Sequence, residues 1–168
     1  KSVRICGVTM RRPRKLPMTT ACVSVTGRTN VSLFQCVMNN EGASGSTILV
    51  AGGAVLQLHS CTVRGGVKAG ITAIAANVLC ARTHISDNVG HGIFALQSAL
   101  SFHRTHVNRN GLRGFCLMGR CVAVLNHIEI KSNAQGQLDL VDEQDLTIRS
   151  KDVQTDQRSV NMLKEANV

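Results

Sequence analysis

The 168-residue sequence predicts an all-β fold, a parallel β-helix in which about six coils stack on one another. Three observations predict it: a pattern that recurs at a nearly constant interval along most of the chain, short segments with apolar residues at alternate positions, and turn residues at matching places in each repeat. A repeat too short to bury its apolar face alone must stack on its neighbours.

Two segments show the repeat most clearly, HISDNVGHGIF at residues 84–94 and HVNRNGLRGF at residues 106–115. Asn88 and Asn110 hold the same place in them, and Asn133 holds it again one repeat later. The apolar residue five places after each Asn recurs as well. The series comprises Ile93, Phe115 and Leu138.

The same register extends in both directions and predicts three short strands per coil with one face turned inward. Going backwards, the pair Val78 and Cys80 matches Leu56 and Leu58, then Val31 and Leu33, then Val3 and Ile5. Going forwards, the expected pairs are Leu100 and Phe102, Val122 and Val124, and Leu146 and Ile148. The β-helix is therefore expected over residues 1–152. Residues 153–168 are expected to form a C-terminal cap with a short helix, because the period changes around Val160 and Leu163 and a solenoid end needs covering.

The segments SDNVGHGI, NRNGLRGF and KSNAQGQL resemble the repeats of the right-handed parallel β-helix family, the pectate-lyase-like fold. The resemblance implies a right-handed coil. It also implies that Asn88, Asn110 and Asn133 stack at a tight turn and join their side-chain amides in a structural ladder. Asn tolerates the left-handed backbone of such a turn, and its amide both donates and accepts hydrogen bonds. Gly66 takes the Asn position in the preceding coil, so the ladder is expected to stop there.

Catalysis is the alternative that the resemblance suggests, as a polysaccharide lyase, hydrolase or epimerase or a degenerate relative of one. Enzymes of this fold carry clusters of carboxylates on an outer face, whereas the middle coils here hold few acidic residues. Gly90-His91-Gly92 matches a short motif of polygalacturonases, but the companion motifs are absent. The chain also has no Trp and no Tyr to stack on sugar rings. We therefore assign no catalytic residue from the sequence.

Outward positions after each Asn turn are apolar in several coils and predict an exposed apolar stripe. Contiguous exposed apolar surface usually marks an interface. The leading hypothesis is therefore a non-catalytic scaffold, part of a longer protein or a large assembly, whose stripe binds a protein partner or is covered by a flanking segment of the same chain. The apolar stripe comprises Leu49, Ile74, Phe94, Leu96 and Met118.

Positive charge favours a third hypothesis, an RNA-contacting subunit of a ribonucleoprotein or a contact with an acidic protein surface. The net charge is +9, and the first coil carries the loop MRRPRKLPM, residues 10–18. A basic loop of this kind suits phosphate contact. The candidate anion-binding residues are Arg11, Arg12, Arg14 and Lys15.

Neither a metal nor a cofactor is expected. The seven Cys include no C-x-x-C pair, which argues against a zinc site. His84 and His106 are expected to stack in adjacent coils, but two His without a third ligand make a poor metal site. Mostly reduced, buried thiols favour an intracellular location, and no apolar stretch approaches the length of a membrane span.

Overall fold

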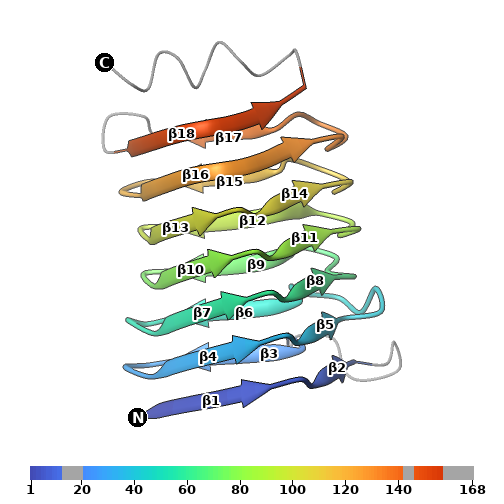
Figure 1. Cartoon of the computed structure of the whole chain (residues 1–168), viewed down its shortest axis with the longest axis vertical. Helices are drawn as coiled ribbons and strands as arrows, with labels where there is room; N and C mark the ends of the chain where they lie inside the picture. Colours follow the sequence, from blue (N-terminus) through green and yellow to red (C-terminus); the bar gives the residue numbers. More distant parts are fainter. Residues whose placement is uncertain (13–20, 142–145, 157–168) are drawn as a thin grey trace.

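The computed structural model describes residues 1–12, 21–141 and 146–156, and these residues form a parallel β-helix of stacked coils (Figure 1). All strand pairs within it are parallel and join residues of successive coils. The predicted fold class is therefore confirmed, with three stacks of strands running along one axis. The described part of the chain contains no α-helix, and none of it forms a helix long and apolar enough to cross a membrane.

Two of the three stacks form one twelve-stranded sheet, which we call sheet A, and the third forms a six-stranded sheet, sheet B. The first stack of sheet A contains β1 (Ser2–Cys6), β4 (Asn30–Phe34), β7 (Val55–His59), β10 (Asn77–Ala81) and β13 (Ala99–His103). The second stack contains β2 (Thr9–Arg11), β5 (Val37–Asn39), β8 (Thr62–Arg64), β11 (His84–Ser86) and β14 (His106–Asn108). The longer strands β16 (Val122–Lys131) and β18 (Thr147–Thr155) pass through both stacks. Sheet B contains β3 (Val23–Thr26), β6 (Ile48–Ala51), β9 (Ala69–Ile74), β12 (His91–Leu96), β15 (Phe115–Met118) and β17 (Leu138–Val141).

The core lies between the sheets and follows the predicted register through the first five coils. Val78 pairs with Leu56 on one side and Leu100 on the other, and all three are at most 2% exposed. Alternate residues of each strand point inward. Phe102 and Phe115 fill the centre of the core and meet edge to face, with ring centroids 5.2 Å apart.

The predicted register is wrong by one residue in the sixth coil, and in β18 it is Ile148, not the expected Leu146, that continues the column of Leu100. Leu100 pairs with Ala123, and Phe102 pairs with Leu125, so Val122 faces outward and is 47% exposed. The extra residue lies between Met118 and Val122. Up to Met118, the strand pairs of sheet B keep the residue spacing of the earlier coils. The strand pair of sheet A that includes Val122 is spaced one residue further apart. Residues 122–125 are all apolar, so alternation could not decide which pair faces inward, and a slip of one residue exchanges the faces.

A single residue with positive φ bends each coil between the first and second stacks of sheet A. Such a left-handed residue turns the chain sharply without a loop. The side chains at this bend form a column along the axis, and its last four members are exposed. The column comprises Gly7, Gln35, Ser60, Arg82, Arg104, His127 and Asp152.

The three ladder Asn are buried at the turn between the second stack and sheet B, and their amides form a hydrogen-bonded chain. Asn88 Nδ2 donates to Asn110 Oδ1 at 2.9 Å, and Asn110 Nδ2 donates to Asn133 Oδ1 at 2.8 Å. At its N-terminal end, Asn88 Oδ1 accepts from the backbone N–H of Gly66. The chain continues beyond Asn133 through Gln137 to Asp156, with bonds of 2.6 and 2.7 Å. The sequence pattern did not point to these last two members.

Three glycines make room for the ladder. A Cβ on Gly92 would lie 2.9 Å from Asn110 Nδ2 and 2.7 Å from the carbonyl oxygen of Gly114. Gly70 and Gly114 stand in the same relation to Asn88 and Asn133. A side chain at these positions would therefore push the amides of the next coil out of line.

The C-terminal boundary differs slightly from the expected one at residue 152, because β18 continues to Thr155. The expected capping helix around Val160 and Leu163 lies outside the described residues.

Candidate functional site on the outer face of sheet A

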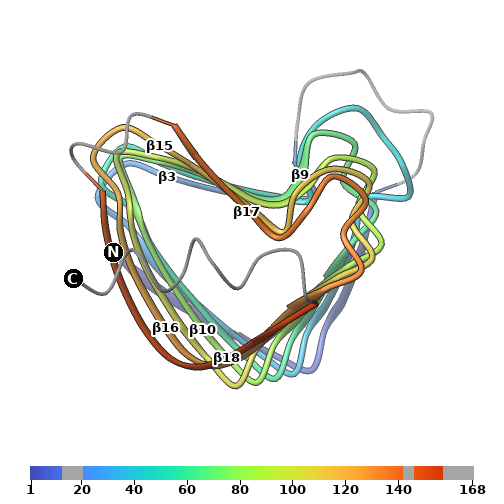
Figure 2. The same cartoon turned by 90° about the horizontal axis from the view of Figure 1, so that it is seen from above.

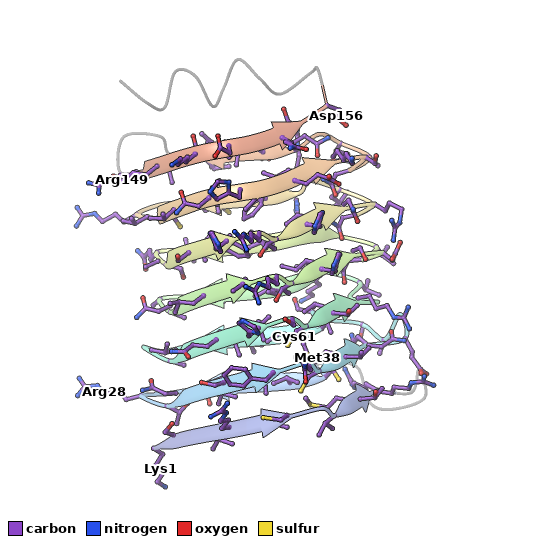
Figure 3. The ribbon with its side chains drawn as sticks, viewed as in Figure 1. Lys1, Arg28, Met38, Cys61, Arg149 and Asp156 are labelled. Atoms are coloured by element: carbon purple, nitrogen blue, oxygen red, sulfur yellow. The ribbon has the colours of Figure 1, made fainter. Side chains whose placement is uncertain are left out.

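Imidazole and charged side chains gather on the outer face of sheet A, at its two central columns. Figure 3 shows nitrogen-bearing side chains that recur from coil to coil along this face. The second stack supplies one column, because its strands place every other side chain outward in register. The bend residues supply the other column. We call the two columns the histidine face, which comprises His84, His106, Glu129 and Gln154 together with Arg82, Arg104, His127 and Asp152.

His84 and His106 pair in register on β11 and β14, and their rings stack as expected, 4.7 Å apart and inclined by 3°. The pKa of His84 is lowered, first by partial burial and then by the neighbouring His106 and Arg109. Glu129 acts in the opposite direction but does not reverse the shift. His84 therefore favours its neutral form near pH 7.

One coil further on, β16 adds a carboxylate and an ammonium to the same column. His106 Nδ1 lies 3.6 Å from Glu129 Oε1, and Lys131 Nζ lies 3.1 Å from the same oxygen. Burial alone would raise the pKa of Glu129, but Lys131 and His106 lower it overall. Glu129 is thus held ionised between two groups that carry or can carry positive charge.

The bend column adds a second histidine–carboxylate pair. His127 Nδ1 lies 3.0 Å from Asp152 Oδ2, and the His127 ring meets that of His103 edge to face at 5.5 Å. Both pairs face one shallow pocket of about 140 Å³. The pocket is lined by His106, His127, Ile128, Glu129, Asp152 and Gln154.

The pocket is lined mostly by polar side chains. In both pairs Nδ1 faces the carboxylate, which leaves Nε2 of each ring for a ligand. Glu129, Asp152 and the Gln154 carbonyl can accept hydrogen bonds from hydroxyl groups. In the described residues no group of three or more His, Cys, Asp or Glu is arranged to hold a metal ion.

The apolar stripe lies on the opposite side, on the outer face of sheet B. Ile74, Leu96 and Met118 follow one another in register, and Val141 of β17 extends this column. Phe94 lies in the neighbouring column between Thr72 and Cys116. Leu49 is separated from Phe94 by Thr72, so the structure brings four of the five predicted residues together and leaves Leu49 apart.

The remaining candidates from the sequence are the basic residues of the first coil and His91 of the Gly-His-Gly motif. Arg11 is exposed at the end of β2, whereas Arg12 is only 5% exposed and offers little surface to an anion. Arg14 and Lys15 lie outside the described residues. His91 lies at the start of β12, on the sheet B side, where its Nδ1 accepts a long hydrogen bond of 3.4 Å from the backbone N–H of Arg113.

Sequence reasoning missed His127 and Asp152 because they lie at the bend and not at an alternating strand position. The sequence did contain a signal for them. A polar residue recurs once per coil at an interval close to the coil length, in the series Arg82, Arg104, His127 and Asp152. Polar residues that recur at the coil length are typical of a shared outward column.

Residues 4–153 match the family described as the right handed beta helix region. The chain belongs to this family. The right-handed coil and the resemblance drawn from the repeat segments are thereby confirmed. A comparison with curated proteins finds no match.

Solved structures similar to this β-helix include three forms of the periplasmic alginate epimerase AlgG. The unsubstituted protein has a TM-score of 0.71 at 14% identity, and a singly and a doubly substituted form each have 0.72 at 15%. Each alignment covers 90% of this chain and 42% of the AlgG chain, so the β-helix spans less than half of that protein's length. At this identity the likeness shows the fold alone.

Proposed function

We propose that the histidine face binds an acidic polysaccharide, with one sugar unit seated in the pocket at its C-terminal end. The observation that carries the proposal is the meeting of two histidine–carboxylate pairs, His106 with Glu129 and His127 with Asp152, at one pocket. The similarity of the fold to an enzyme that acts on alginate supports a polysaccharide as the ligand.

The direction of the polymer follows from the column geometry. Adjacent strands are about 4.8 Å apart, so each outward column offers a group at this interval along the axis. Arg82 and Arg104 are exposed in adjacent coils and lead toward the pocket. A linear polymer that lay along the axis, with a carboxylate on each repeating unit, would meet a cation or an imidazole in the coils of Arg82, Arg104 and His127.

Recognition at the pocket would rest on hydrogen bonds and charge and not on ring stacking, since the chain has neither Trp nor Tyr. Sugar hydroxyls would donate to Glu129, Asp152 and the Gln154 carbonyl, while Nε2 of His106 and His127 would contact the ligand from the other side. The basic groups of the neighbouring columns would favour a charged sugar over a neutral one.

Titration calorimetry with oligogalacturonate, oligomannuronate and a neutral cello-oligosaccharide tests the proposal. We expect both acidic oligomers to bind, and the double variant His106→Ala, His127→Ala to weaken binding at least tenfold. His91→Gln is the matched control, because it changes a histidine on the other side of the molecule, and it should bind as the native chain does. Equal binding of the neutral oligomer, or an equal loss with His91→Gln, would contradict the proposal. Salt-sensitive binding of RNA with no binding of either acidic oligomer would favour the ribonucleoprotein alternative.

A further inference from the structure

The outer face of sheet B has a different character from the histidine face. The column of Ile74, Leu96, Met118 and Val141 crosses four coils, and Ile74 is 38% exposed while the other three are half-buried. Asp139 is the only acidic or basic residue, His aside, within the strands of this sheet. Figure 2 shows that the outline on this side is concave, whereas the sheet A side bulges outward.

Cations lie along both edges of this face. Lys68 directly precedes β9, and Arg113 lies shortly before β15. The Lys68 carbonyl accepts from His91 N–H at 3.1 Å, and Arg113 N–H donates to His91 Nδ1. Lys68 is exposed, and Arg113 Nε lies 3.8 Å from Asp139 Oδ2. At the other edge, Arg120 is exposed shortly after β15 ends. Lys68 and Arg120 therefore place positive charge near the two ends of the strands that form the apolar column.

We propose that this face binds an acidic amphipathic α-helix of a partner protein, lying along the solenoid axis. The strand spacing of about 4.8 Å is close to the rise of about 4.5 Å between residues i and i+3 of a helix. Residue i+7 follows at about 10.5 Å, close to the distance of two coils. A helix with apolar residues at i, i+3 and i+7 thus places one anchor against each of Ile74, Leu96 and Met118.

The charge and the hydrogen bonding of this face favour a helix over an added strand. The strands β9, β12 and β15 already pair with neighbours on both sides along the stack, so the face around Ile74, Leu96 and Met118 offers side chains and not free backbone groups. A helix satisfies its own backbone and presents an apolar face to a groove. Acidic residues beside the apolar anchors would then meet Lys68 and Arg120 at the two edges.

The test uses the whole chain and three fluorescein-labelled synthetic peptides followed by fluorescence anisotropy. The first peptide has Leu at heptad positions a and d and is otherwise rich in Glu. The second has Lys in place of Glu, and the third has the composition of the first in shuffled order. We expect saturable binding of the acidic amphipathic peptide and at least tenfold weaker binding of the other two.

Two matched variants locate the site. Ile74→Asp should weaken binding of the acidic peptide at least tenfold, whereas Leu79→Asp should leave it unchanged, because Leu79 is 40% exposed on the outer face of sheet A. Lys68→Glu should lower affinity for the acidic peptide and raise it for the Lys peptide. Circular dichroism melting confirms that each variant is folded. The proposal is overturned if the shuffled peptide binds as well as the ordered one, if Leu79→Asp weakens binding as much as Ile74→Asp, or if no peptide binds.

Discussion

The imidazole rings of His84 and His106 lie parallel in adjacent coils, 4.7 Å apart. The pKa of His84 is lowered first by burial and then by the charge that the facing His106 ring can carry. The neighbouring Arg109 adds to this effect on His84. His84 therefore takes up a proton less readily in the folded protein than in the unfolded chain.

The first prediction is that stability falls as the pH is lowered from about 7 to about 5. The pKa values of His84 and His91 are lowered in the folded state, mainly by burial. Their contribution is complete above the unfolded His pKa of about 6.5 and is lost as the pH falls through the lowered folded pKa. Urea midpoints measured across this range should show the decline, and His84→Gln should make it shallower. A midpoint that rises toward pH 5 would contradict the assignment.

The second prediction concerns the Asn ladder. Asn110→Ala removes the acceptor of Asn88 Nδ2 and the donors to Asn133 Oδ1 and the Ile85 carbonyl, all of them buried. Leaving such groups unpaired should cost about 2 to 4 kcal/mol in the free energy of unfolding. Asn108→Ala, at an outward position shortly before the ladder residue, should cost less than about 0.5 kcal/mol. Similar losses for the two variants would show that the ladder does not stabilise the fold.

The third prediction separates steric crowding from backbone conformation at glycine. A Cβ on Gly92 would lie 2.6 Å from Val107 Cγ1 as well as against the ladder, so Gly92→Ala should cost about 3 kcal/mol. Gly27 has a φ of 67° and nothing within 4 Å of its Cβ position, so Gly27→Ala should cost only about 1 to 2 kcal/mol. Chemical denaturation of both variants checks the order, which would be reversed if left-handed backbone strain dominated.

The fourth prediction concerns thiol reactivity. Cys6 is exposed, while Cys36, Cys61, Cys80, Cys116 and Cys121 are buried. Burial raises the pKa of Cys80 well above its usual value and that of Cys61 and Cys116 to a lesser extent. The thiolate is the reactive form, so iodoacetamide near pH 7.5 should label Cys6 first. Peptide mass spectrometry over time checks this order, and early labelling of Cys80 would mean that the core opens locally.

Much of the fold was predictable because each coil must present the same inner shape to the next. The inward columns through Val78 and Leu100 and the stacking of the ladder Asn both follow from spacing. The sixth coil could not be placed, since Val122 and Ala123 are both apolar and differ only in the face they occupy. The bend could not be predicted either, because Arg104 and His127 adopt positive φ, a conformation that their residue types do not favour. The pocket followed from that bend and so was missed with it.

The amide chain from Asn88 to Asp156 has a direction. Each side chain in it points its N–H group toward the C-terminal coil, so the bond dipoles add along the axis, as peptide dipoles add in an α-helix. The end toward which the donors point is electropositive, and the carboxylate of Asp156 stands there, accepting from Gln137 Nε2 and from the backbone N–H of Ser132. Asp156 thus acts as an anionic terminus for a macrodipole built from side chains.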